Sequence, residues 1–282
     1  MAATGSSVRS RLRSGNARLW VYGGLAAALV LLGIIGPYVV SDPTLGQLDN
    51  RMLGIGSDGH LLGTDGLGRD TLDRLLAGAR PSMTAALLPV IVAGLIGTVL
   101  GVTAGMSGRA VHSAIMRTLD VFYAFPAVLL AIAIASSLGA GTTSTVISLA
   151  IVLIPPVARI AETETLAIGG MDFMETARVS GASPISVAYR HVLPNVAPAL
   201  LVYCTSLVGL ALVFAGGMSF LGLGVAPPNP EWGQMINDQR QSLFSHPAAA
   251  LIPAFLIFAA SFIFNMLGDA LSDALDIRRK GR

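Results

Sequence analysis

The sequence predicts an all-α membrane protein with six transmembrane helices and no separate soluble domain. Of its 282 residues, 53% are hydrophobic and only 12% are charged, whereas about a quarter of the residues of an average soluble domain are charged. The charges are also unevenly spaced, so that uncharged apolar stretches of the roughly 20 residues needed to cross a bilayer recur along the chain. Because a charge at the bilayer centre costs about 2.5–3.5 kcal/mol or more, these charge-free gaps locate the spans.

The chain is expected to begin with a basic cytosolic tail, residues 1–18, that leads into a first transmembrane helix, residues 19–41. This apolar run is longer than the core of a secretory signal, which has about 7–15 residues, and no small-x-small cleavage site follows it. We therefore predict an uncleaved span. Residues 42–80 then form an extracytoplasmic loop with an amphipathic stretch.

Residues 81–268 are expected to form a transmembrane domain of five further helices, followed by a cytosolic tail, residues 269–282. The charge-free gap over residues 121–158 is too long for one crossing and is divided by the turn-forming segment Gly139–Thr143. The predicted spans are therefore residues 81–108, two crossings within 121–158, 196–221 and 249–268.

Three patterns within these spans predict how the helices pack. Small residues at four-residue spacing let two helix backbones approach closely in lipid, and Ala93, Gly97, Gly101 and Gly105 follow this pattern. The pair Pro155-Pro156 is expected to kink or break its helix. The polar series Ser261, Asn265 and Asp269 admits two interpretations, hydrogen bonds between helices or a pore lining.

Two segments outside the membrane also carry predictions. The stretch from Asp70 to Ala79 is expected to form an external surface helix before the second span, with Asp70 and Arg74 paired at i,i+4 spacing. The segment Pro227–Gly233 is expected to form a rigid outer loop, and its Trp232 suits an aromatic belt at the membrane interface.

The distribution of basic residues orients the spans. If the N-terminus lies in the cytosol, thirteen of the eighteen Lys and Arg residues lie inside, in agreement with the positive-inside rule. Both termini are then cytosolic. Three outer arginines close to the second span, Arg69, Arg74 and Arg80, weaken the rule there.

This orientation places a charged loop, residues 163–195, in the cytosol. Its residues Asp172 and Glu175 have the spacing of a capping box at the start of a short helix, and Gly181 is expected to end that helix. Ser183-Pro184 starts a second helix, which Pro194 is expected to end. From local chemistry alone, these residues either only cap and turn the chain or present a surface on which another protein docks.

The spacing Glu-x-Ala-x3-Gly, followed by Leu-Pro, resembles the "EAA" loop of ABC importer permeases. The residues that match are Glu175, Ala177, Gly181, Leu193 and Pro194. Thr176 departs mildly from the pattern, and His191 with its neighbours is similar to the peptide and nickel branch of the family.

Four more segments resemble the C-type permease subunit of dipeptide and oligopeptide importers: His60–Asp70, Asp120–Pro126, Ser219–Gly233 and Asn265–Asp276. Together with the inner loop they cover the chain from residue 60 to residue 276, in order. One departure is Ile277, where the family usually has proline.

The resemblance implies a type I ABC importer permease fold with a cytosolic coupling helix. It also implies a second permease subunit, one or more cytosolic ATPase subunits and an extracytoplasmic substrate-binding protein as partners, with the chain embedded in the lipid of the cell membrane. Short peptides are the implied cargo. Alternatives are nickel or another small solute, or an autonomous secondary transporter.

Other functions find no support in the sequence. A Walker A loop needs a lysine followed by a helix, but the single lysine, Lys280, lies two residues before the end of the sequence. ATP is therefore expected to bind a partner, with no cofactor, metal or catalytic residue in this chain. The lone Cys204 is expected to be a packing residue, and the four histidines are expected in separate loops. The net charge of +2 gives no indication of nucleic-acid binding.

Overall fold

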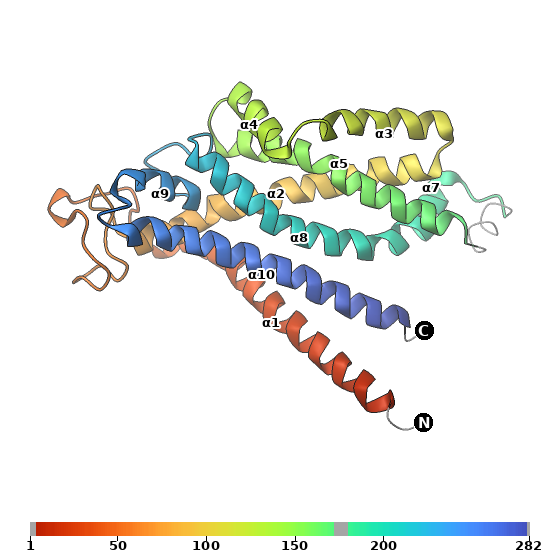
Figure 1. The fold of residues 1–282 in the computed structure, drawn as a ribbon, viewed down its shortest axis with the longest axis horizontal. Coiled ribbons are helices and arrows are strands. Elements are labelled where there is room, and N and C mark those ends of the chain that lie inside the picture. Colours follow the sequence, from red (N-terminus) through yellow and green to blue (C-terminus); the bar gives the residue numbers. More distant parts are fainter. Residues whose placement is uncertain (1–3, 172–179, 281–282) are drawn as a thin grey trace.

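The computed structural model describes residues 4–171 and 180–280, and these residues form helices and loops without a β-strand. Figure 1 shows an elongated bundle of helices. The helices are α1 (Thr4–Val39), α2 (Thr71–Met106), α3 (Arg109–Tyr123), α4 (Ala127–Leu138), α5 (Thr142–Gly169), α7 (Pro184–Val187), α8 (Leu193–Phe220), α9 (Trp232–Asp238) and α10 (Pro247–Lys280). Short 3-10 turns lie at Leu48–Asn50 (η1) and Arg240–Ser242 (η3), and a π-helical turn (η2) lies at Ala188–Val192.

The bundle has two distinct ends. At one end, called here the loop end, lie residues 40–70 and 221–246; α7 lies at the other, called here the α7 end (Figure 1). Among the described residues, five helices are long and apolar enough to cross a membrane, and α3 with α4 would make a sixth span bent by 87°. The predicted all-α membrane fold is thereby confirmed, with five crossing helices, or six if α3 and α4 together form one bent span.

Helix α2 lies at the centre of the bundle and contacts α1, α5 and α8. It begins at Thr71, where the Asp70 carboxylate accepts a hydrogen bond from the Asp73 backbone N–H at 2.9 Å, as expected of an N-cap. The prediction of a separate surface helix over residues 70–79 is therefore wrong. These residues form the first turns of α2, and Leu75 and Ala79 are buried in the hydrophobic core of the bundle.

The small residues of α2 pack against α5, as predicted. A Cβ atom added at Gly97 would lie 2.8 Å from the Cβ of Val157, and one added at Gly101 would lie 2.2 Å from the Ala158 carbonyl oxygen. Such distances leave no room for a side chain, so the two helix backbones are in direct contact. Dispersion between close backbones replaces the hydrophobic driving force that is missing in lipid.

The turn predicted at Gly139–Thr143 is present between α4 and α5, and both of its glycines have positive φ, +87° and +150°. Of the kink or break predicted at Pro155-Pro156, the break is absent: α5 continues through both prolines to Gly169. Neighbouring helices can hold a proline-containing helix together in a membrane, and here Val157 and Ala158, next to the prolines, pack against α2.

The outer helices are longer than the predicted spans. Helix α1 begins at Thr4 and α10 extends to Lys280, so residues assigned to the N-terminal and C-terminal tails continue the helices. In α10, the Ser261 hydroxyl donates to the Gly209 carbonyl of α8 at 2.9 Å, whereas Asn265 bonds within its own helix. For Ser261 this favours the interhelical interpretation over a pore lining.

Candidate functional site

The second helix predicted within residues 163–195 is present at the α7 end. The Ser183 hydroxyl accepts a hydrogen bond from the Ser186 backbone N–H at 3.3 Å, and Pro184 is the first residue of α7. Gly181 has φ +76° and open space where a Cβ would lie. This left-handed conformation suits a helix stop, but the helix expected before it lies largely outside the described residues.

The α7 segment has two different faces. Val187 and Val192 are buried in the core together with Val196. On the other side, Ile185 is 82% exposed and Tyr189 is 73% exposed. Residues four apart on a helical turn lie close together on one face, so these two side chains form an exposed apolar pair, called here the elbow pair.

The predicted helix end at Pro194 is wrong. The chain passes from α7 through the π-helical turn η2 into α8, in which Pro194 lies in the first turn. The Leu193 backbone N–H donates to the Ala188 carbonyl, and this wider turn makes room for a proline ring that would otherwise clash with the preceding turn. The result is a helical segment of 37 residues, Pro184–Phe220.

The five residues predicted to couple the chain to an ATPase are only partly described. Gly181 lies at the turn before α7, Leu193 is half-buried at the start of α8, and Pro194 beside it is exposed. Glu175 and Ala177 lie outside the described residues. The sequence analysis did not predict the elbow pair. Its spacing of i,i+4, on a different helix face from Val187 and Val192, could have indicated a second apolar face.

A charged clamp joins α3 to α5. The His112 Nε2 atom lies 2.8 Å from the Glu162 carboxylate, and Arg159 forms an ion pair with Asp120. His112 lies in helix α3, and not in a loop as predicted. Asp120 begins the family segment that ends at Pro126, so the clamp holds the chain directly before the bend between α3 and α4.

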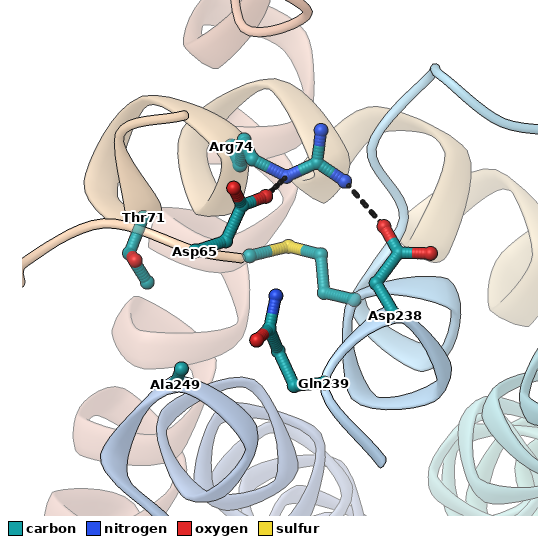
Figure 2. Close-up of a pocket in the computed structure, with 7 residues that line it drawn as sticks. Asp65, Thr71, Arg74, Asp238, Gln239 and Ala249 are labelled. Atoms are coloured by element: carbon teal, nitrogen blue, oxygen red, sulfur yellow. Dashed lines mark hydrogen bonds and ion pairs between the residues drawn. The ribbon is translucent and has the colours of Figure 1, made fainter. Parts of the chain in front are cut away.

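At the loop end, two arginines and two aspartates form an ionic cluster, called here the loop-end cluster. Arg74 lies between Asp65 and Asp238 in Figure 2, with its guanidinium nitrogens 3.5 Å and 3.0 Å from them. Arg69 contacts the same two carboxylates at 2.6 Å and 3.0 Å. The predicted Asp70–Arg74 pair is not formed, since Asp70 caps α2 and lies 2.7 Å from His60.

Trp232 is not at a membrane interface, contrary to the prediction. Its side chain is fully buried at the start of α9, and its Nε1–H donates to the Leu75 carbonyl of α2 at 3.0 Å. The Glu231 carboxylate caps α9 and accepts a hydrogen bond from the Ser82 hydroxyl of α2 at 2.9 Å. These contacts fix the segment Pro227–Gly233 to the central helix.

Among the described residues, no group of three or more His, Cys, Asp or Glu side chains could hold a metal ion. Cys204 is half-buried and packs against the hydrophobic core, as expected of a packing residue. A cleft of about 560 Å³ opens at the loop end beside Arg51 and Asp238. At the α7 end, the elbow pair is exposed on a helical segment that continues into α8.

Comparison with known proteins agrees with this geometry. The sequence profile of the family "Binding-protein-dependent transport system inner membrane component" matches residues 97–280. The glutathione transport system permease protein GsiD of Pectobacterium atrosepticum is 41% identical over 224 residues, which are 79% of this chain and 74% of that protein. GsiD of Salmonella typhimurium is 40% identical over 262 residues, 93% of this chain and 86% of that protein.

The fold is also similar to a solved structure. A chain of the MetNI methionine ABC transporter, in a structure titled as inward facing, superposes with a TM-score of 0.56 at 16% sequence identity. The match covers 70% of this chain and 96% of that chain. At this identity the similarity concerns the fold, and it agrees with the predicted type I importer permease architecture.

Proposed function

Because this chain belongs to the family of binding-protein-dependent transport system inner membrane components, we propose that it forms half of the translocation pathway of an ATP-driven importer. It is a multi-pass membrane protein. In the proposed assembly it pairs with a second permease subunit, receives cargo from an extracytoplasmic binding protein and is driven by a separate cytosolic ATPase.

Short peptides are the proposed cargo. Relatives about 40% identical are named as glutathione transport permeases, and glutathione is itself a small peptide. Nickel or another small solute remains the alternative, because the segment around His191 is similar to both the peptide and the nickel branches. A binding assay on the partner binding protein, with short peptides and Ni²⁺ compared, distinguishes the two cargo classes.

The elbow pair is the observation that carries the coupling proposal. Ile185 and Tyr189 are large apolar side chains, 82% and 73% exposed, that lie outside the core formed by the described residues. Their burial against another protein would be favourable. They are continuous through η2 with α8. A force applied to the elbow pair would therefore move a membrane-crossing helix directly.

The proposed mechanism is alternating access. Closure of the ATPase pair on ATP pulls the loop that contains Gly181, and the helices tilt so that the pathway opens outward to receive cargo. Hydrolysis returns it to the inward-open state. The coupling is mechanical, because docking shifts the balance between two arrangements of one bundle.

The proposed orientation, with both termini in the cytosol, rests on the count of basic residues and places the loop-end cluster outside. Arg69 and Arg74 were two of the three outer arginines that opposed the positive-inside rule, and each is paired with both Asp65 and Asp238. These ion pairs compensate the two buried positive charges within the folded chain, although all three arginines still count as exceptions to the rule. Arg80 differs, because no described carboxylate pairs with it.

Co-purification of the full chain with its ATPase subunit tests the coupling proposal. Replacing Ile185 and Tyr189 with Asp should abolish capture of the ATPase while membrane insertion is unchanged. The matched control is Leu61→Asp, which changes a 71% exposed leucine at the loop end and should leave capture unchanged. Equal capture by both variants would refute docking at the elbow pair, and solute transport by the purified chain alone would favour an autonomous transporter.

A further inference from the structure

Arg80 differs from the other arginines near the start of α2. It is exposed, and no described carboxylate forms an ion pair with it. Its guanidinium instead lies over the Tyr38 ring of α1, 5.9 Å from the ring centroid. A cation at this position in a membrane protein needs an anionic or aqueous partner from outside the chain.

Beside Arg80, a groove of about 290 Å³ runs between α1 and α2. Apart from Tyr38, Arg80 and Thr84, its lining is apolar, and the Thr84 hydroxyl is already bonded to the Arg80 carbonyl oxygen at 2.8 Å. The groove therefore presents one cation at one end and hydrocarbon along the rest. The other lining residues are Val30, Gly33, Ile34, Met83, Leu87, Leu88 and Ile91.

The length of the groove matches one leaflet of a bilayer. At a rise of 1.5 Å per residue, the eleven steps from Arg80 to Ile91 span about 16 Å, and half of a hydrocarbon core is about 15 Å. Both helices are candidate membrane spans, and Tyr38 and Arg80 lie toward the loop end of each. The cation is thus placed at headgroup level and the apolar lining at acyl-chain depth.

We propose that this groove binds an anionic phospholipid, with its phosphate on Arg80 and one acyl chain between α1 and α2. A guanidinium binds phosphate through directed, charge-assisted hydrogen bonds. A phospholipid supplies both the anion and the hydrocarbon, whereas an apolar helix of a neighbouring subunit would cover Arg80 without a counter-ion. The inference rests only on insertion of α1 and α2 into a membrane, and not on the proposed cargo or motor.

Photo-crosslinking in membranes tests the proposal. The photoreactive residue p-benzoylphenylalanine replaces either Leu88, in the groove, or Leu95, which is 67% exposed on the same helix outside it. The full chain is inserted in membranes of phosphatidylglycerol and phosphatidylethanolamine, irradiated, and its adducts are identified by mass. We expect phosphatidylglycerol to be enriched about fivefold at Leu88 over Leu95, since one basic side chain near a membrane surface contributes about 1 kcal/mol.

A second arginine separates specific binding from general charge. Arg80→Gln should return the adducts at Leu88 to the ratio found at Leu95, whereas Arg240→Gln, which changes an exposed arginine at the loop end, should not. Equal lipid ratios at the two positions, or enrichment that survives Arg80→Gln, would overturn the proposal. A polypeptide adduct at Leu88 would also overturn it, because the occupant would then be a protein helix. None of these outcomes depends on transport activity.

Discussion

Replacing Asp238 with Asn should strongly destabilise the loop end. The Asp238 carboxylate lies 3.0 Å from Arg69 and 3.0 Å from Arg74, and Asp65 provides the only other negative charge of the loop-end cluster. The substitution keeps the shape of the side chain but leaves two positive charges with one negative charge. The Arg69 and Arg74 side chains are only 4% and 2% exposed, so water cannot compensate for the lost charge.

The size of the effect follows from this burial. Removing one partner of a buried ion pair costs about 3–5 kcal/mol. The Asp238 side chain is itself 18% exposed, so we expect the lower part of this range, about 3 kcal/mol. A chain of this size loses about 2 °C in melting temperature per kcal/mol, which predicts a fall of about 6 °C.

Thermal unfolding of the detergent-purified chain, followed by circular dichroism, measures this fall. The matched control is Asp58→Asn, which removes an exposed carboxylate from the same loop and should leave the melting temperature nearly unchanged. Adding Arg74→Gln to Asp238→Asn restores the charge balance of the loop-end cluster. The double variant should therefore be more stable than the sum of the two single changes predicts.

Two outcomes would refute this reasoning. If Asp238→Asn melts at the same temperature as Asp58→Asn, the loop-end cluster does not stabilise the fold. If the effects of Asp238→Asn and Arg74→Gln simply add, the two residues do not interact energetically, whatever their distance.

Two further substitutions test the helix contact and the elbow. Gly101→Leu should destabilise the bundle by about 1–3 kcal/mol or more, because a Cβ there would lie 2.2 Å from a backbone oxygen of α5. The control Gly24→Leu, in open space on α1, should leave the stability unchanged. Equal melting temperatures of the two variants would contradict the predicted contact between α2 and α5. Gly181→Val should leave membrane insertion intact but abolish import and cargo-stimulated ATP hydrolysis, since a φ of +76° costs a non-glycine residue about 1–3 kcal/mol. Gly108→Val, at φ −68°, is the control, and full import by the Gly181 variant would disprove the coupling role.

Much of the helical architecture could be predicted because the signals are local. A charge in hydrocarbon is costly wherever it lies, so charge-free gaps mark the spans without knowledge of their neighbours. The caps at Ser183-Pro184 and the turn at Gly139–Thr143 depend on residues adjacent in sequence. The small residues of α2, such as Gly101, also predicted a close contact, although not the identity of the partner helix.

Predictions failed where a distant segment changes the outcome. Pro155-Pro156 would end an isolated helix, but α5 continues because it is packed against α2. Pro194 is a local exception: it would end the helix before it, but the adjacent π-helical turn η2 accommodates it. Trp232 has the character of an interface residue, and it is buried because the Leu75 carbonyl, 157 positions away in sequence, accepts its hydrogen bond.

The sequence by itself determined that this chain crosses a membrane several times and that its inner loop resembles the docking loop of importer permeases. Both conclusions follow from solvation costs and motifs that are independent of tertiary contacts. Only the tertiary structure decided which arginines of the loop end are paired with carboxylates, that α7 continues into α8, and that Ile185 and Tyr189 face outward. These properties depend on distances between residues remote in sequence and on the direction of side chains, neither of which a linear pattern specifies.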